Sequence, residues 1–232
     1  MDIRLHYTEK GTGDVLFLLH GNGEDHTYFS ELIDTFSENY HVIALDTRGH
    51  GKSPRGKTPF TIKQFAQDLK EFMDEKQIAS AHLLGFSDGG NIALTFALQY
   101  PERVKKLILN GANLKPEGVK RSVQLPIILG YRIASYFAKR SDKAKKNAEM
   151  LSLMVNEPQM EYIDLIHLPM HTLVIAGTRD MILEKHTRAI AAHIPFADLV
   201  ILKGDHFIAK KKAPAFGQAV LKFLEKESDT LK

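Results

Sequence analysis

Six short apolar runs constrain the fold of this chain most strongly. They cover residues 15–19, 41–45, 81–84, 106–109, 172–176 and 199–202, and a glycine, asparagine or aspartate follows each within two positions. Runs of this length are typical of strands that are buried on both faces of a parallel sheet. Helical patterns separate several of them, at 61–77, 91–100 and 185–193, and another follows the last run, at 213–227. This alternation predicts an α/β fold built on a mostly parallel sheet.

Two segments depart from this alternation. Residues 3–7 alternate in polarity with period two, which predicts an outer strand with one wet face. Residues 114–168 contain no convincing core strand, and helical patterns occupy 122–139 and 144–155. We expect a core domain from 1–113 and 169–232, with 114–168 inserted as a helical lid. Ordinary packing helices are the alternative interpretation of the insertion.

The composition excludes several kinds of chemistry. The 232 residues include no cysteine, so disulfides, thiolate catalysis and cysteine-based zinc sites are ruled out. The net charge of +3 does not by itself indicate a nucleic-acid binder. No signal peptide and no apolar run of about 18 residues is visible, so we expect a soluble cytoplasmic protein.

The most informative motif is G-F-S-D-G at residues 85–89, between a predicted strand and a predicted helix. It matches G-x-S-x-G in the context that this motif requires. The tight turn leaves no room for side chains two residues before and after the serine. It exposes the Ser87 hydroxyl beside a helix N-terminus, where negative charge is favoured. Ser87 is therefore the candidate nucleophile.

A serine hydroxyl needs a general base, and eleven histidines are available. His206 follows the last apolar run and precedes the C-terminal helix, at the edge of the sheet where ligands bind. The others lie in predicted strands and helices or at element ends without a partner pattern. His206 is therefore the candidate base.

The base in turn needs an acid that orients the imidazole. Asp180 follows the strand before that of His206, which gives the chain order Ser87, Asp180, His206 typical of α/β-hydrolases. Asp205 is the rival, although neighbouring loop residues usually point apart. A helix N-cap is the structural alternative for Asp180.

A tetrahedral intermediate also needs hydrogen-bond donors for its oxyanion. We expect these from the backbone N–H groups of Asp88 and of Asn22, which lies in the glycine-rich loop H-G-N-G at 20–23. The Asn22 side chain is a further candidate donor. For the substrate-binding surface we expect Phe86, Met154, Met181 and Phe207.

Together these segments resemble the α/β-hydrolase superfamily over essentially the whole chain. The matching segments are 20–23, D-T-R-G-H-G-K-S at 46–53, G-F-S-D-G-G at 85–90, G-T-R-D at 177–180 and G-D-H-F at 204–207. The resemblance implies an eight-stranded, mostly parallel sheet, a helical cap of variable size after the sixth strand, and no cofactor. It also implies that the 46–53 loop is structural, so Asp46, Arg48 and His50 lie outside the active site.

The chain departs from this pattern in two ways. It is short for a family that often carries a longer cap, which implies a small or open pocket. Met181 follows the acid, where a small or β-branched residue and then a proline are more familiar.

Several reactions fit this set of residues, because fold does not settle substrate. A serine nucleophile argues against a haloalkane dehalogenase, which uses a carboxylate at that place. The apolar residues of the insertion favour an acyl group of modest size, so we expect a carboxylesterase that cleaves a small ester through an acyl-enzyme. A lactonase, a thioesterase, a carbon–carbon bond hydrolase and a non-catalytic binding protein are the alternatives.

The expected partner is a small ester-like molecule, with neither nucleic acid nor a membrane involved, and a homodimer is left open. Basic runs at 139–146 and 210–212 raise a third interpretation, a basic surface protein. Charge runs are normally solvated faces, and Asp142 interrupts the first, so we favour the enzyme.

Overall fold

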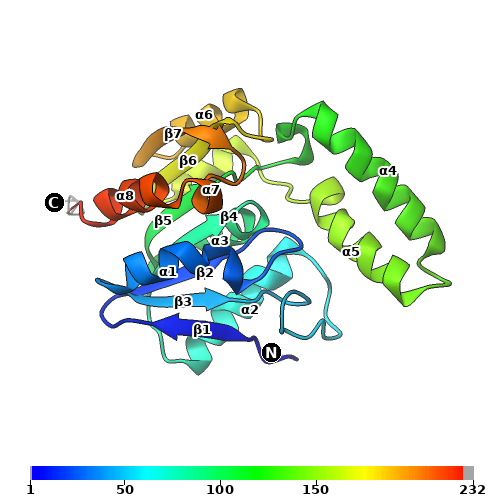
Figure 1. Ribbon diagram of the computed structural model, residues 1–232, viewed down its shortest axis with the longest axis horizontal. Coiled ribbons are helices and arrows are strands. Elements are labelled where there is room, and N and C mark those ends of the chain that lie inside the picture. Colours follow the sequence, from blue (N-terminus) through cyan, green and yellow to red (C-terminus); the bar gives the residue numbers. More distant parts are fainter. Residues whose placement is uncertain (1, 227–232) are drawn as a thin grey trace.

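A single seven-stranded sheet organises the protein (Figure 1). The computed structural model describes residues 2–226. The strand order is β1-β3-β2-β4-β5-β6-β7, and only β1 runs antiparallel to its neighbour. The strands are β1 (Tyr7–Lys10), β2 (Val15–Leu19), β3 (His41–Leu45), β4 (Ala81–Phe86), β5 (Val104–Asn110), β6 (Thr172–Arg179) and β7 (Ala197–Asp205).

Helices connect the strands and cover both faces of the sheet. The α-helices are α1 (Ser30–Ser37), α2 (Ile62–Glu75), α3 (Asp88–Gln99), α4 (Arg121–Phe137), α5 (Asp142–Asn156), α6 (Glu184–His193), α7 (Ile208–Lys211) and α8 (Ala213–Leu224). Short 3-10 helices are η1 (His26–Phe29), η2 (Pro101–Arg103), η3 (Pro116–Gly118) and η4 (Tyr162–His167). In residues 2–226, no helix is long and apolar enough to span a bilayer.

The predicted α/β fold with a mostly parallel sheet is confirmed, with two differences in detail. The described sheet has seven strands where eight were expected. The outer strand is present, but it begins at Tyr7 and not at residue 3. One reason is that the backbone N–H of His6 donates to the Ser53 hydroxyl instead of to a neighbouring strand.

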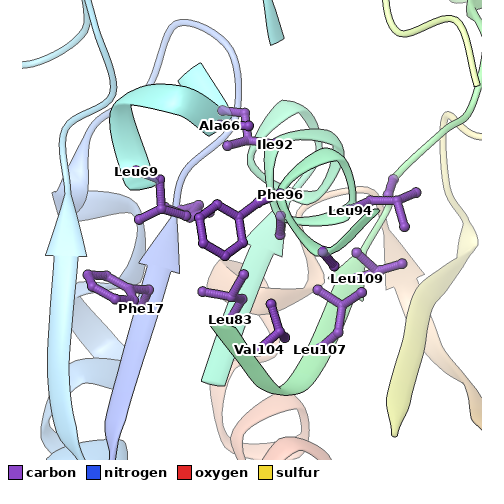
Figure 2. Close-up of a cluster of buried hydrophobic side chains, with 14 of the residues drawn as sticks. Phe17, Ala66, Leu69, Leu83, Ile92, Leu94, Phe96, Val104, Leu107 and Leu109 are labelled. Carbon is purple, nitrogen blue, oxygen red and sulfur yellow. The ribbon is translucent and has the colours of Figure 1, made fainter. Parts of the chain in front are cut away.

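The strands are buried because their alternate side chains enter two separate hydrophobic clusters. Phe17 and Leu19 of β2 belong to the cluster that α2, α3 and α6 complete, whereas Leu16 and Leu18 belong to the cluster that α1 and α8 complete. Figure 2 shows the first cluster, where Leu69 of α2 and Phe96 of α3 lie over the strands. Every residue of β4 is buried. The centre of the sheet is therefore a rigid platform for whatever follows β4.

Residues 121–156 form an antiparallel pair of helices, the α4–α5 hairpin, between β5 and β6. Figure 1 shows it projecting from one side of the molecule, with α4 outermost. Helix α5 is fastened to the core. Arg55 donates two hydrogen bonds to Glu149, at 2.8 and 2.9 Å, and the Ile62 N–H donates to Glu157 at 2.6 Å.

The D-T-R-G-H-G-K-S loop at 46–53 is held by buried charge. The Arg48 guanidinium donates Nε and Nη2 to the two oxygens of Asp68, each at 2.7 Å, and both side chains are almost fully buried. The Asp46 carboxylate accepts the backbone N–H groups of His26 and Lys52, and the rings of His6 and His26 also contact it. These contacts tie the loop to α2, to η1 and to the residue before β1.

We expect Arg48→Leu to lower the free energy of unfolding by about 3–5 kcal/mol, because it leaves the Asp68 carboxylate buried without its partner. Urea unfolding of wild type and variant measures this. Arg188→Leu is the matched control. It breaks a pair with Glu184 in which both side chains are exposed, so the expected cost is at most about 1 kcal/mol. Equal losses in the two variants would contradict the structural role of Arg48.

Candidate active site

Ser87 occupies the sharp turn between β4 and α3, at the carboxyl end of a central strand. Its backbone has φ 52° and ψ −119°, a conformation that residues with side chains rarely adopt. The turn is fixed by two hydrogen bonds. The Ser87 N–H donates to the Asn110 carbonyl at 2.8 Å, and the Asn91 N–H donates to the Ser87 carbonyl at 3.0 Å.

The glycines on either side of Ser87 are required by packing. A Cβ atom on Gly85 would lie 2.2 Å from the carbonyl oxygen of Gly89. A Cβ on Gly89 would lie 2.0 Å from the carbonyl oxygen of Leu19. Both partners are backbone atoms, so neither clash can be relieved by a side-chain rotation. The spacing of the G-x-S-x-G motif is therefore a steric property of this turn.

The structure joins Ser87, His206 and Asp180 in one chain of hydrogen bonds. His206 Nε2 lies 3.0 Å from the Ser87 Oγ, and His206 Nδ1 lies 2.6 Å from the Asp180 Oδ1. His206 and Asp180 are both buried, whereas Ser87 is partly exposed. The three residues come from the ends of β4, β6 and β7, which meet at one edge of the sheet.

The Asp180 carboxylate is held in its ionised form. Burial of this carboxyl would raise its pKa, but hydrogen bonds from His206 and from the N–H groups of Ile182 and Gly177 hold the pKa below its ordinary value. Asp180 thus accepts from the imidazole and from the backbone on both sides. An ionised acceptor at Nδ1 keeps the proton on that nitrogen and leaves Nε2 to face the serine.

The rival acid, Asp205, points away from this chain of residues. It is the last residue of β7, and it binds Lys211 Nζ at 2.5 Å and the Phe207 N–H at 3.0 Å. The described hydrogen bonds of its carboxylate do not include one to His206. Of the two aspartates, only Asp180 has the position that orienting the imidazole requires.

The two expected oxyanion donors belong to the residue after Ser87 and to the loop after β2. Asp88 is the first residue of α3, so its N–H has no acceptor within the helix. Asn22 lies in the loop after β2, and hydrogen bonds of His20 hold this loop in place. The His20 Nε2 accepts the Thr47 N–H at 3.0 Å, and its Nδ1 therefore donates to the Gly21 carbonyl at 2.7 Å.

The Asn22 side chain has a different task from the additional donor we expected. Its Nδ2 donates to the Asp88 Oδ2 at 2.9 Å and to the Met150 carbonyl of α5 at 2.8 Å. Both hydrogens of the amide are thereby engaged. The donor candidates from this loop are therefore backbone groups, while the side chain connects the loop to α3 and α5.

Asp88 belongs to a buried network of amides that the sequence did not reveal as a unit. Its second oxygen accepts from Asn91 Nδ2 at 3.3 Å, and Asn91 also binds the side chain and the backbone N–H of Asn113. Burial raises the pKa of Asp88 to about 6, although the hydrogen bonds from Asn22 and Asn91 act in the opposite direction. The partnership with Asn91 could have been foreseen, because residues three apart share a helix face. Asn113 carries no comparable signal.

Aromatic rings support His206 from within the core. Phe86 is buried and stacks on Tyr28, with ring centroids 4.3 Å apart and planes 4° apart. Its ring also lies 4.8 Å from that of His206. Phe86 exposes only 1% of its surface, so it positions the histidine and does not present its ring to a substrate, contrary to our expectation.

The other three residues expected to contact substrate remain accessible. Met154 of α5 and Met181 are partly exposed, and Phe207 is 37% exposed beside His206. The backbone carbonyls of both methionines are hydrogen-bonded. The Gln124 side chain donates to the Met154 carbonyl, and the Lys120 N–H donates to the Met181 carbonyl.

Glu24 is a titratable neighbour of the triad that the sequence analysis missed. One carboxyl oxygen, Oε2, is buried and has no hydrogen-bond partner among the described residues. Burial raises the pKa of Glu24 to about 7, against the effect of a hydrogen bond from the Gly21 backbone. No sequence pattern marks it, because the burial of a loop carboxyl depends on how the loop packs in the folded chain.

This geometry can perform acyl transfer. The Ser87 Oγ is within hydrogen-bond distance of a base, the base is oriented by an anion, and the N–H of the next residue, Asp88, has no acceptor within its helix. The same arrangement serves any reaction in which a hydroxyl attacks a carbonyl.

Comparison with known proteins identifies the family. Residues 14–132 match the family model described as alpha/beta hydrolase fold. The 2-hydroxy-6-oxononadienedioate/2-hydroxy-6-oxononatrienedioate hydrolase of Escherichia coli (strain K12) is similar to this chain, with 39% identity over 138 residues. That match covers 53% of this chain and 48% of the relative, so the chain spans about half the length of the curated relatives it matches.

Solved structures agree at the level of the fold. The enol-lactonase from Burkholderia xenovorans LB400 superposes with a TM-score of 0.82 at 23% identity, over 97% of both chains. A thermophilic esterase from Thermogutta terrifontis gives 0.81 at 22% identity, over 96% of this chain and 93% of the other. From the family match and this fold we conclude that the chain belongs to the α/β-hydrolase fold family.

Proposed function

We propose that the protein is a serine hydrolase that cleaves a small carboxylic ester through an acyl-enzyme. The observation that carries the proposal is the continuous hydrogen-bonded chain from the Ser87 Oγ through His206 to the Asp180 carboxylate. In this proposal Ser87 is the nucleophile, His206 the general base and then acid, and Asp180 the orienting anion. The N–H groups of Asn22 and Asp88 bind the oxyanion.

The reaction follows from these positions. The Ser87 Oγ attacks the ester carbonyl carbon while His206 Nε2 takes the hydroxyl proton, and the carbonyl oxygen becomes the oxyanion. When the tetrahedral intermediate collapses, the carbon–oxygen bond to the leaving group breaks and His206 protonates the departing alkoxide. Water then attacks the acyl-enzyme with the same base, which releases the carboxylic acid and restores Ser87.

We propose further that residues 1–113 and 169–232 are the catalytic core and that 114–168 act as its lid. Support comes from the attachment of α5, since the bond between Asn22 and the Met150 carbonyl places this helix beside the proposed oxyanion site. In this arrangement Met154, Met181 and Phe207 line the acyl pocket.

A carbon–carbon bond hydrolase is the second candidate. It is favoured by one specific observation, the 39% identity to an Escherichia coli hydrolase whose name describes 2-hydroxy-6-oxo dicarboxylic substrates. The same serine, base and donors would serve attack on a ketone carbonyl. Parallel assays with a p-nitrophenyl ester series, a small lactone and a 2-hydroxy-6-oxo dienoic acid separate the candidates, because the preferred substrate has the highest kcat/KM.

Labelling with a fluorophosphonate tests the nucleophile without knowledge of the substrate. We expect one adduct of the probe, mapped by peptide mass spectrometry to Ser87, because only a serine activated by a neighbouring base reacts readily with phosphorus. Denatured protein is the control and should remain unlabelled. A folded protein without an adduct on Ser87 would favour the alternative of a non-catalytic binding protein.

A further inference from the structure

The outer face of α4 carries large apolar side chains that the protein leaves exposed. They recur at helical spacing on one side of the helix, and their exposed fractions run from 46% for Phe137 to 70% for Tyr136. The set is Leu125, Leu129, Ile133, Tyr136 and Phe137. We call it the α4 stripe. Large apolar patches on a protein surface commonly mark a place of interaction.

Positive charge is concentrated on the same helix and at its tip. Residues 120–146 include eight lysines and arginines but a single acidic residue, Asp142, although the whole chain has a net charge of only +3. Arg132 is exposed within the stripe, three residues from Leu129 and four from Tyr136. Lys139 and Arg140 follow in the turn at the tip and are also exposed. The surface thus combines apolar and cationic groups within the same helical turns.

Although the sequence alone led us to expect no membrane partner, we propose that the α4 stripe docks the protein on an anionic lipid surface. An amphipathic helix with apolar residues on one side and lysines or arginines beside them is suited to the boundary between lipid headgroups and acyl chains. Tyr136 and Phe137, whose rings meet edge to face at 5.0 Å, lie at the end of α4, and aromatic side chains favour such a boundary. The projecting position of α4 in Figure 1 lets the stripe reach a flat surface before the core does.

Charge argues against a second copy of the chain as the occupant. In an antiparallel pair of α4 helices, Lys120 and Arg121 at one end would face Lys139 and Arg140 at the other. Like charges placed together in this way oppose association. An acidic peptide would satisfy the cations, but it would not account for the large apolar side chains that lie exposed beside them from Leu129 to Phe137.

Sedimentation with vesicles tests the proposal on the full chain at low ionic strength. We expect binding to vesicles of equal parts phosphatidylglycerol and phosphatidylcholine, and at least tenfold weaker binding to pure phosphatidylcholine. Salt should release the protein, because exposed charges are screened over about 10 Å at 0.1 M. Failure to bind the anionic vesicles at low salt would overturn the proposal.

Matched double variants assign the binding to the stripe. Arg132→Gln with Lys139→Gln should weaken binding at least about tenfold, since each cation near an anionic surface contributes about fivefold. Leu129→Ser with Ile133→Ser should weaken it comparably, because less apolar surface enters the lipid. Lys210→Gln with Lys212→Gln removes the same charge from the other basic run and should bind like wild type. An equal loss of vesicle binding in this control would show that net charge alone drives binding and would overturn the assignment to the α4 stripe.

Other occupants give distinct results. A concentration-dependent dimer in light scattering that Leu129→Ser dissolves would identify a second copy and overturn the proposal. Binding to polyglutamate that matches vesicle binding and does not depend on Leu129 and Ile133 would do the same. Ser87→Ala should bind vesicles as wild type does, so this surface is tested independently of the proposed catalysis. Circular dichroism verifies that each variant is folded.

Discussion

Ser87→Ala should reduce turnover of p-nitrophenyl esters at least about a thousandfold and abolish the burst of p-nitrophenol that precedes steady state. The methyl group cannot form the acyl-enzyme, so only binding and the oxyanion donors remain to assist attack by water. Stopped-flow absorbance on wild type and variant measures both the burst and the steady rate. The fold should be retained, because alanine keeps the backbone hydrogen bonds that hold the turn and introduces no larger side chain.

The matched control for this experiment is Ser135→Ala, at an exposed position of α4. It should leave both kinetic phases unchanged. Turnover by Ser87→Ala at the wild-type rate would remove Ser87 from the mechanism and, with it, the proposed acyl-enzyme. A residual slow rate without a burst would instead agree with water attacking a substrate held by the backbone donors.

Asp180→Asn should lower kcat by about three to four orders of magnitude, whereas Asp205→Asn should have little effect. The amide is nearly isosteric but uncharged, so it can favour the wrong tautomer of His206 and cannot stabilise the imidazolium that forms during attack. The neighbouring aspartate is the natural control, because its carboxylate binds Lys211 and the Phe207 N–H and not the imidazole. Both rates come from the same ester assay.

The pattern of the two aspartate variants decides between the acids. An inactive Asp205→Asn with an active Asp180→Asn would overturn the proposed role of Asp180. If both variants lost activity, thermal unfolding would separate a damaged fold from a damaged site. Asp180 is buried and binds two backbone N–H groups, so part of its loss can be structural. If the folded Asp180→Asn variant reacts more slowly with the fluorophosphonate, the loss of activity comes from weaker activation of Ser87.

The sheet was predictable because each strand carries its own signal. The runs at 15–19 and 41–45 coincide with β2 and β3, since a strand with apolar residues on both faces must be buried on both faces. The ends of β6 and β7 were harder, because both strands extend to Arg179 and Asp205 through glycines that resemble turns. There the two strands pair with a register shift between Gly177 and Arg179, which no local pattern encodes.

The catalytic candidates were predictable for a related reason. In a parallel sheet the residues after neighbouring strands converge at one edge, so the positions of Ser87, Asp180 and His206 along the chain implied their proximity. The contacts around them were not foreseeable in the same way. Phe86 resembled a substrate contact by its position beside the serine, yet stacking on Tyr28 draws it into the core. Such a contact joins residues from separate elements, and only the packed structure reveals it.

The bond from the Asn22 amide to the Met150 carbonyl makes the proposed oxyanion loop and helix α5 mechanically interdependent. Because the same amide donates to the Asp88 carboxylate, the Asn22 side chain connects the loop after β2 to the start of α3 and to the hairpin. Any movement of α5 away from the core must either break this bond or pull on the loop that holds one of the two proposed donors. Opening of the α4–α5 hairpin would therefore also displace the proposed oxyanion donor. The site would be active only when the hairpin is packed against the core.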